Sequence, residues 1–185
     1  MKGIIFTSFQ DMVEEEIGLE CWETIIKNPA VTSGGMYTSV NTYADEELLA
    51  LIAGLSNYTN VPIDTLIEKF GEKLFPKLAD SLPKNLVEYD DLWSFLAAVG
   101  DEIHVEVKKL NPDAPTPSIK VLSRAKNTMT LSYKSPRKMC VLALGLIRSA
   151  GEYYNTPVTV THGQCMHTGH EYCELKVMTK EAESD

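Results

Sequence analysis

The spacing of hydrophobic residues changes from helical to strand-like about two thirds of the way along the chain. This change limits the possible folds more than any other feature of the sequence. Upstream, Ile5, Phe9 and Val13 follow the i, i+4, i+8 spacing of a buried helical stripe. Downstream, the β-prone runs 119–122 and 129–133 flank a polar turn and predict an antiparallel hairpin. The sequence therefore predicts an α+β fold.

The first two thirds of the chain are expected to form a helical N-terminal lobe. Beyond the first helix, the apolar spacing predicts helices over residues 19–26, 45–55, 62–70 and 92–110. Gly71 and Pro76 are expected to kink or divide the helix that begins at residue 62, and Gly100 is expected to split the last helix. Asp45 is a candidate N-cap, because a carboxylate can accept from the first backbone N–H groups of a helix.

The C-terminal lobe is expected to be a four-stranded antiparallel sheet with one helix packed on it. That helix is predicted over residues 138–154, and Ser135 is placed like its N-cap. Alternating runs at residues 158–160 and 173–177 predict two strands in addition to the hairpin.

The composition suits one soluble domain, which we expect to span residues 1–180, followed by a disordered tail at 181–185. The 26 acidic and 17 basic residues give a net charge of −9. Such a surface repels phosphates and anionic lipids, so nucleic acid and membranes are poor candidate partners. The longest apolar run covers residues 139–147, whereas about 20 residues are needed to cross a bilayer. We therefore expect a cytoplasmic protein whose cysteines stay reduced.

His104 lies on the predicted buried side of a helix, in the segment VGDEIHVEVKKL. Val99, Ile103 and Val107 mark the apolar stripe of that helix. One interpretation is a buried histidine satisfied by a single hydrogen bond. The other is an axial ligand of haem iron, because a porphyrin supplies four of the iron ligands and one imidazole on an apolar wall is then sufficient.

Tyr133, Ser135 and Arg137 alternate along an extended segment. Side chains at i, i+2 and i+4 of a strand point to one face, so the phenol, the hydroxyl and the guanidinium would face the same way. Three donors, one of them permanently cationic, suit a dianionic group such as the two propionates of haem. A polar strand end that precedes a helix cap is the alternative interpretation.

Three cysteines and a histidine gather around the predicted final hairpin: Cys140, His162, Cys165 and Cys173. Three thiols and an imidazole are an ordinary tetrahedral set for structural zinc. The nearby His167 and His170 could supply the nitrogen instead, so the spacing does not fix that ligand. Buried cysteines without a metal are the alternative interpretation.

Several of these features together resemble one family. The N-terminal MKGIIF, the histidine in DEIHVEVKKL, Pro117 and the motif Tyr133-x-Ser135-x-Arg137 are similar to the H-NOX family. These are the haem nitric oxide/oxygen-binding domains of bacterial gas sensors and soluble guanylate cyclases. The resemblance covers nearly the whole chain and implies a b-type haem held noncovalently between the two lobes.

The resemblance also implies roles for individual residues. His104 would be the proximal ligand of the haem iron, Pro117 would press on the porphyrin, and the propionates would be bound by Tyr133, Ser135 and Arg137. The implied pocket positions are Ile5, Phe9, Leu74, Leu142 and Leu146. Oxygen-binding members carry a tyrosine, a tryptophan and an asparagine at the positions of Leu142, Phe9 and Leu74. Stable binding of O2 is therefore not expected.

The function implied by the resemblance is a stand-alone nitric oxide sensor that also binds carbon monoxide and is not an enzyme. Nitric oxide would break the bond between iron and His104, and the signal would pass to a separate histidine kinase or cyclic-di-GMP enzyme. The alternative is a redox sensor in which oxidation of Cys140, Cys165 and Cys173 releases zinc. No hydrolase or nucleotide-binding motif competes with these two interpretations.

Overall fold

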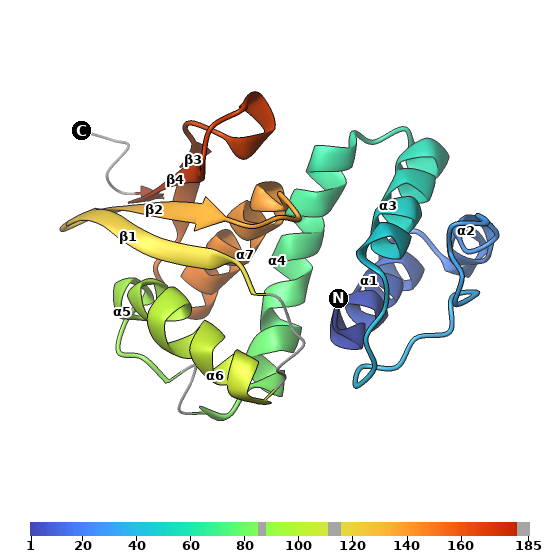
Figure 1. The fold of residues 1–185 in the computed structure, drawn as a ribbon, viewed down its shortest axis with the longest axis horizontal. Coiled ribbons are helices and arrows are strands. Elements are labelled where there is room, and N and C mark those ends of the chain that lie inside the picture. The colour runs from blue at the N-terminus through green and yellow to red at the C-terminus, as the bar shows by residue number, and fades with distance from the viewer. Residues whose placement is uncertain (85–87, 111–115, 181–185) are drawn as a thin grey trace.

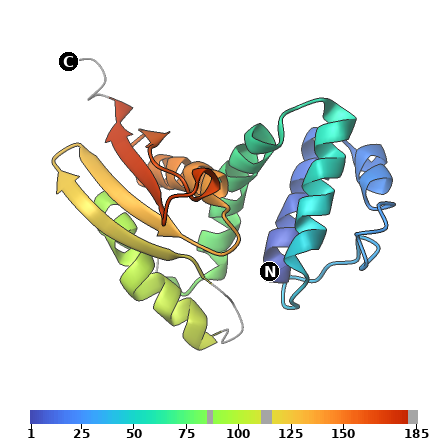
Figure 2. The same ribbon diagram turned by 45° about the horizontal axis from the view of Figure 1, so that its top comes forward.

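The computed structural model describes residues 1–84, 88–110 and 116–180, which form two lobes (Figure 1). The N-terminal lobe contains α1 (Gly3–Glu16), α2 (Leu19–Ile25) and α3 (Asp45–Thr59). The long helix α4 (Ile63–Ser81) lies between that lobe and the sheet in both views of the chain (Figure 2). The tail at 181–185, which the sequence predicts to be disordered, lies outside the described residues.

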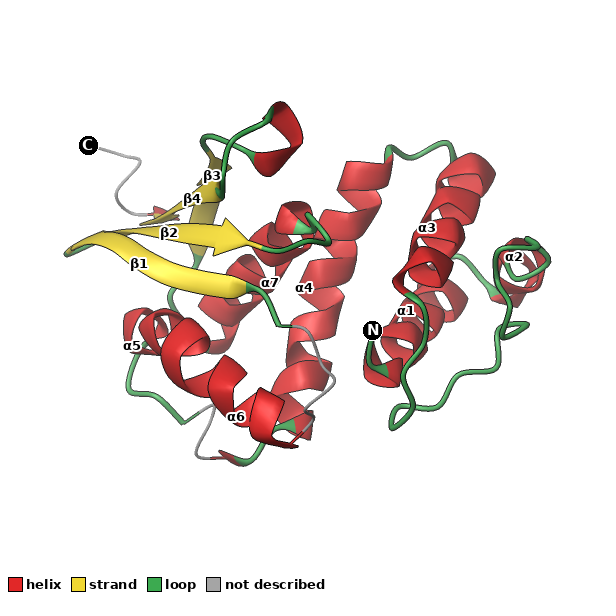
Figure 3. Cartoon of the chain, viewed as in Figure 1, coloured by secondary structure: helices red, strands yellow, loops and turns green. Residues whose placement is uncertain are grey.

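The C-terminal lobe contains one sheet with the strand order β1-β2-β4-β3. Its strands are β1 (Ser118–Ala125), β2 (Thr128–Lys134), β3 (Val158–His162) and β4 (Cys173–Thr179), and every pairing is antiparallel. Helix α7 (Cys140–Tyr153) packs against α4 and β3 (Figure 3). Side chains alternate along β2, where Met129, Leu131 and Tyr133 are buried. The predicted α+β class with a four-stranded antiparallel sheet is confirmed.

Helix α4 is a single element, so the predicted interruption at Gly71 and Pro76 does not divide it. The reason is its crossing with α7. A Cβ atom at Gly71 would lie 2.4 Å from the carbonyl oxygen of Leu142, and a Cβ atom at Gly145 would lie 2.0 Å from that of Glu68. The two glycines therefore allow the helix backbones to pack directly together, and this packing offsets the low helix propensity of glycine and proline.

Two predicted N-caps are wrong. Asp45 is the first residue of α3 rather than its cap, and its carboxylate bonds to distant groups instead of the helix backbone. Helix α7 begins at Cys140 with Met139 as its cap. The Ser135 hydroxyl accepts from the backbone N–H of Arg137 at 3.3 Å, within the turn that precedes the helix. The Asp45 and Ser135 side chains thus bond to groups outside the first turns of α3 and α7.

The predicted split of the helix over residues 92–110 is confirmed, in an unusual form. Helix α5 (Leu92–Ala98) passes into a π-helical turn, Val99–Ile103, and then into α6 (His104–Leu110). The Asp91 carboxylate caps α5 by accepting from the backbone N–H of Ser94 at 2.7 Å. Gly100 lies in the π-helical turn, next to the start of β1.

The hydrophobic core has two parts, one in each lobe, and Val141 and Leu146 of α7 contact both. Phe6, Phe9 and Phe70 lie in the N-terminal part, whereas the inward residues of β2 and β4 build the C-terminal part. The boundary between the two parts is where the candidate functional site lies. Within the described ranges no helix has the length and apolar character needed to span a membrane.

Candidate functional site

A cavity of 630 Å³ lies between the two lobes. This volume is within the range of pockets that hold cofactors, which is about 300–1,000 Å³. Its wall is largely apolar and comes from α1, α4, the π-helical turn, the sheet and α7. Nine of the ten expected pocket residues line it: Ile5, Leu74, His104, Pro117, Tyr133, Ser135, Arg137, Leu142 and Leu146.

Phe9 is the exception, and its expected place near the pocket stays a prediction. It is fully buried in the core of the N-terminal lobe, where its ring packs edge-on against Phe70 at 5.2 Å between ring centroids. It is not among the described residues that line the cavity. The position one helical turn earlier on α1, Ile5, does line it.

His104 is the first residue of α6, and its ring lies on the cavity wall. The Nδ1 atom is 3.0 Å from the backbone carbonyl oxygen of Pro117. Because a carbonyl can only accept, Nδ1 carries the proton and the lone pair is on Nε2. Burial lowers the pKa of His104 more than the bond to Pro117 raises it, so the ring is neutral at pH 7. A neutral imidazole with an available Nε2 lone pair is the form that binds a metal.

Tyr133 and Ser135 reach the cavity from the end of β2, and each is only 4% exposed. Lys134 between them points away, toward the ion pair with Glu171 at 2.8 Å. The alternation inferred from the sequence is therefore present from Tyr133 to Ser135, but the extended backbone predicted as far as Arg137 is wrong, because β2 ends at Lys134 and residues 136–137 form a turn. Burial raises the pKa of Tyr133, so its phenol is a neutral hydrogen-bond donor at physiological pH.

Arg137 lines the cavity from the turn that follows β2, and its Nε donates to the Asp45 carboxylate at the start of α3. The other oxygen of Asp45 accepts from the N-terminal amine of Met1 at 2.7 Å. Burial would raise the pKa of Asp45, but the bonds from Arg137 and the amine outweigh it and lower the pKa. One carboxylate thus joins the chain terminus, α3 and the turn after β2.

Sequence reasoning missed Asp45 and Met1 as parts of this site. Asp45 precedes Arg137 by 92 positions, and nothing in the local pattern around either residue points to the other. The available signal was weak: an acidic residue opening a helix that already has Glu46 and Glu47 in its first turn.

Three of the apolar residues that line the cavity are Leu74 of α4, and Leu142 and Leu146 of α7. Leu74 and Leu142 are 1% and 9% exposed, so water has little access to them. Neither can donate a hydrogen bond to a ligand in the cavity.

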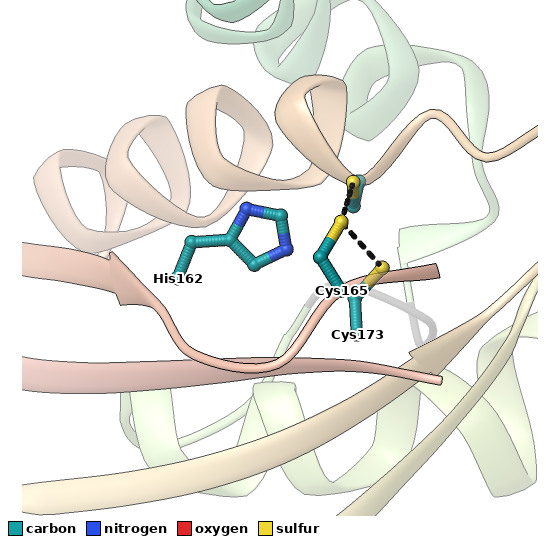
Figure 4. Close-up of side chains that lie close together, drawn as sticks. His162, Cys165 and Cys173 are labelled. Atoms are coloured by element: carbon teal, nitrogen blue, oxygen red, sulfur yellow. Dashed lines mark hydrogen bonds between the residues drawn. The ribbon is translucent and has the colours of Figure 1, made fainter. Parts of the chain in front are cut away.

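The second cluster expected from the sequence also forms. The ligand atoms of Cys140, His162, Cys165 and Cys173 all lie within 4.8 Å of one another. The sulfur of Cys165 is 3.9 Å from that of Cys140 and 3.6 Å from that of Cys173. Figure 4 shows the His162 ring facing the thiols of Cys165 and Cys173. The antiparallel pairing of β3 with β4 brings His162, which ends β3, close to Cys173, which begins β4, and Cys140 joins them from the first position of α7.

His162 is the histidine that the fold places with the thiols. Its Nε2 is buried and has no hydrogen-bond partner among the described residues, which is a costly state for a polar atom. The two other candidates are exposed and already bonded. His167 Nε2 is 2.7 Å from the Lys138 carbonyl oxygen, and His170 Nδ1 is 3.1 Å from the Thr168 hydroxyl.

The separations in this cluster fit a tetrahedral metal ion. Zinc–sulfur bonds of about 2.3 Å at tetrahedral angles hold two thiolate sulfurs about 3.8 Å apart, which matches the 3.9 and 3.6 Å observed. Burial raises the pKa of Cys140 and Cys173, so without a metal these groups are neutral thiols at pH 7. A metal ion would bind in exchange for their protons.

Comparison with known proteins connects this geometry to one family. A family model described as haem-NO-binding (HNOB) matches residues 2–162. The crystal structure of the Fe(II) unliganded H-NOX protein from K. algicida is 37% identical, with a TM-score of 0.89 and coverage of 97% of both chains. The H-NOX protein from S. oneidensis in the Fe(II)NO ligation state is 32% identical, with a TM-score of 0.89, and covers 97% of this chain and 99% of that one.

A more distant relative is the soluble guanylate cyclase gcy-35 of Caenorhabditis elegans. It is 26% identical over an alignment of 174 residues, and the match covers 86% of this chain. The chain spans only 24% of the length of that cyclase.

Proposed function

The chain belongs to the haem-NO-binding (H-NOX) family of gas-sensor domains, and from this premise we propose that it is a haem-based nitric oxide sensor. One observation carries the proposal. His104 donates its Nδ1 proton to the Pro117 carbonyl and so presents an unprotonated Nε2 on the wall of a 630 Å³ apolar cavity. A carbonyl partner of this kind orients a metal-binding histidine and raises its basicity.

The proposed contacts to haem use residues that line the cavity from different elements. His104 Nε2 would bind the iron, and the two buried donors Tyr133 and Ser135 would bind the propionates together with Arg137. Pro117, whose carbonyl holds His104, would contact the porphyrin face. When bound, ferrous haem would supply a binding site for diatomic gases, and the bond that nitric oxide would weaken is the one that His104 would make to the iron.

The cavity wall formed by Leu74, Leu142 and Leu146, here named the distal wall, would face the gas-binding side of the haem. Its apolar character supports discrimination among gases. Ferrous haem retains O2 well only when a hydrogen-bond donor lies near the bound gas. The binding of nitric oxide and carbon monoxide depends much less on such a donor. Leu74, Leu142 and Leu146 provide no donor and keep the wall dry. We propose that the sensor selects nitric oxide and carbon monoxide over O2.

The proposed signal is a displacement of α6 relative to the N-terminal lobe. The Pro117 carbonyl is the hydrogen-bond partner that would hold the His104 ring once the ring no longer bound the iron. At the other end of the cavity, the Arg137–Asp45 ion pair joins the two lobes. A change at the propionate end would therefore alter how the lobes meet. We propose that a separate histidine kinase or cyclic-di-GMP enzyme reads this change, in the cytoplasm.

A second proposed feature is a structural zinc site formed by Cys140, His162, Cys165 and Cys173. The buried, unpartnered Nε2 of His162 favours it, because a metal ion would satisfy that atom. Oxidation of the thiols would release the metal, so a thiol redox sensor is the alternative function. Elemental analysis of protein purified under reducing conditions without chelators tests the site. We expect one zinc per chain, and its absence would refute this feature.

The visible absorption spectrum tests the main proposal. We expect a Soret band in the purified ferrous protein. When nitric oxide is added, we expect this band to shift to the position of five-coordinate nitrosyl haem, in which the histidine is no longer bound. His104→Gly should bind haem poorly unless imidazole is supplied, because the apolar cavity remains while the protein–iron bond is lost. A His104→Gly protein with the wild-type ferrous spectrum in the absence of imidazole would show that His104 is not the ligand.

A further inference from the structure

The π-helical turn Val99–Ile103 ends at His104. The backbone N–H of His104 donates to the carbonyl of Val99, five residues earlier, and so closes the turn. Turns of this type are rare in proteins, because an ordinary α-helical turn has better hydrogen-bond geometry, and they occur often at functional sites. Something outside the helix must therefore hold this segment in the π conformation.

Gly100 and Ile119 provide that contact. A Cβ atom at Gly100 would lie 1.9 Å from the Ile119 carbonyl oxygen and 2.9 Å from its carbonyl carbon. No side chain fits there, since the obstructing atoms belong to the backbone of β1. Only glycine lets the π-helical turn approach the strand this closely.

The same short stretch of chain holds His104. Pro117 directly precedes β1 and Ile119 is the second residue of that strand, so the two carbonyls are two residues apart and are expected to point to the same side of the chain. The Pro117 carbonyl accepts from His104 Nδ1, and the Ile119 carbonyl abuts Gly100. The chain at the start of β1 therefore contacts the helical segment at Gly100 and at His104, which are four positions apart. The contact at His104 is made by its imidazole ring.

We propose that Gly100 is a positioning residue for His104: by seating the π-helical turn against Ile119, it fixes the imidazole between the Pro117 carbonyl and the cavity. The inference rests on the proposed ligation of haem iron by His104. An alanine at position 100 must move the turn away from β1 by about 1 Å, since real Cβ atoms do not approach other atoms within 3.0 Å. The 3.0 Å bond from His104 to Pro117 would then lengthen or tilt.

The test compares Gly100→Ala with Asp101→Ala. Asp101 is exposed and lies in the same turn, so its alanine variant favours the α-helix in the same way without adding an atom against β1. The readouts are the iron–histidine stretching band in the resonance Raman spectrum of the ferrous protein and the rate of haem transfer to apomyoglobin. We expect Gly100→Ala to shift the band beyond its width and to speed haem loss about tenfold, the usual scale for disturbing a partner of a metal-binding histidine. Asp101→Ala should match the wild type in both.

Deletion of Asp101 provides a second variant in case Gly100→Ala does not fold. A π-helical turn holds one residue more than an α-helical turn, so the deletion allows α5 and α6 to join as one α-helix with their faces kept. Circular dichroism checks that the helices remain, and we expect the same band to shift. An unchanged band in every folded variant would overturn the proposal. So would failure of both variants to fold while Asp101→Ala folds, because the turn would then serve the fold as a whole.

The outcomes separate this inference from the proposed function. A wild-type protein that binds no haem refutes the sensor proposal itself. A wild-type protein that binds haem through His104, together with a Gly100→Ala variant of identical band position and haem-loss rate, refutes only the role given to Gly100.

Discussion

Asp45 and Arg137 form an ion pair across 92 positions of sequence, and this pair joins the two lobes at one end of the cavity. The carboxylate also accepts from the N-terminal amine of Met1 at 2.7 Å. The Asp45 side chain therefore connects the N-terminus, α3 and the turn after β2. Since Arg137 also lines the cavity, the same contact links the proposed propionate site to the orientation of the N-terminal lobe.

Asp45→Asn tests this link. The amide cannot hold two cations, so we expect a loss of about 1–2 kcal/mol in the free energy of unfolding, modest because the carboxylate is partly exposed. The pKa of Asp45 is lowered below its ordinary value of 3.8. Its stabilising contribution is therefore complete above pH 3.8 and disappears as the pH falls through the lower folded-state pKa.

Urea unfolding of both proteins between pH 7 and pH 2 checks this expectation. Glu46→Gln is the control, because Glu46 is an exposed neighbour in the first turn of the same helix. A difference between wild type and Asp45→Asn that persists unchanged at the lowest pH would contradict the ion-pair explanation.

Arg137→Ala and Lys134→Ala test the facing of the segment after β2. Arg137 lines the cavity, whereas Lys134 points to Glu171 at the surface. We expect Arg137→Ala to lose haem faster than the wild type, by about tenfold or more, since a charge-assisted hydrogen bond contributes about 1.5–3 kcal/mol. Lys134→Ala should retain haem like the wild type. The measurement is the rate of haem transfer to apomyoglobin, and equal rates for the two variants would contradict the proposed propionate contact.

Cys173→Ser tests the thiol cluster. Cys173 is fully buried at the start of β4, where it pairs with Tyr133 of β2. We expect the variant to lose zinc and to unfold at a lower temperature, because the energy of binding at a structural metal site is part of the folding energy. Cys21→Ser is the matched control, since Cys21 is also a buried thiol but lies in α2, away from the cluster. Equal zinc content in the two variants would show that Cys173 is not a ligand.

Local patterns in the sequence predicted the elements well because each element has a short-range cause. The helical spacing from Ile5 to Val13 and the alternation along β2 follow from burial of one face, and both are present in the structure. The same reasoning failed where a tertiary contact decides the outcome. The continuous path of α4 depends on the approach of Gly71 to Gly145, which are far apart in sequence.

The same distinction between local and tertiary causes applies to the candidate site. The alternation of Tyr133 and Ser135 is a property of extended backbone, so sequence reasoning found it, whereas Arg137 reaches the cavity from the turn after β2. The Asp45 partner and the Pro117 carbonyl at His104 are set by how the lobes and strands pack, and no local pattern encodes either contact. Phe9 lies behind the described cavity wall for a related reason. Its helix buries two faces, one toward the cavity and one toward Phe70.

Gas selectivity gives the sharpest test of the distal wall. The wild type should bind nitric oxide and carbon monoxide and show no persistent O2-bound spectrum in air, because Leu74 and Leu142 offer no hydrogen-bond donor. Leu142→Tyr introduces a hydroxyl at the cavity wall, and Leu142→Phe introduces the same ring without it. A neutral hydrogen bond contributes about 0.5–1.5 kcal/mol, so O2 should dissociate about 2- to 13-fold more slowly from Leu142→Tyr than from Leu142→Phe. Stopped-flow measurement of O2 dissociation checks the comparison. Equal rates would mean that the hydroxyl at position 142 does not reach the ligand, and a stable O2-bound spectrum in the wild type would refute the selectivity while leaving the haem assignment intact.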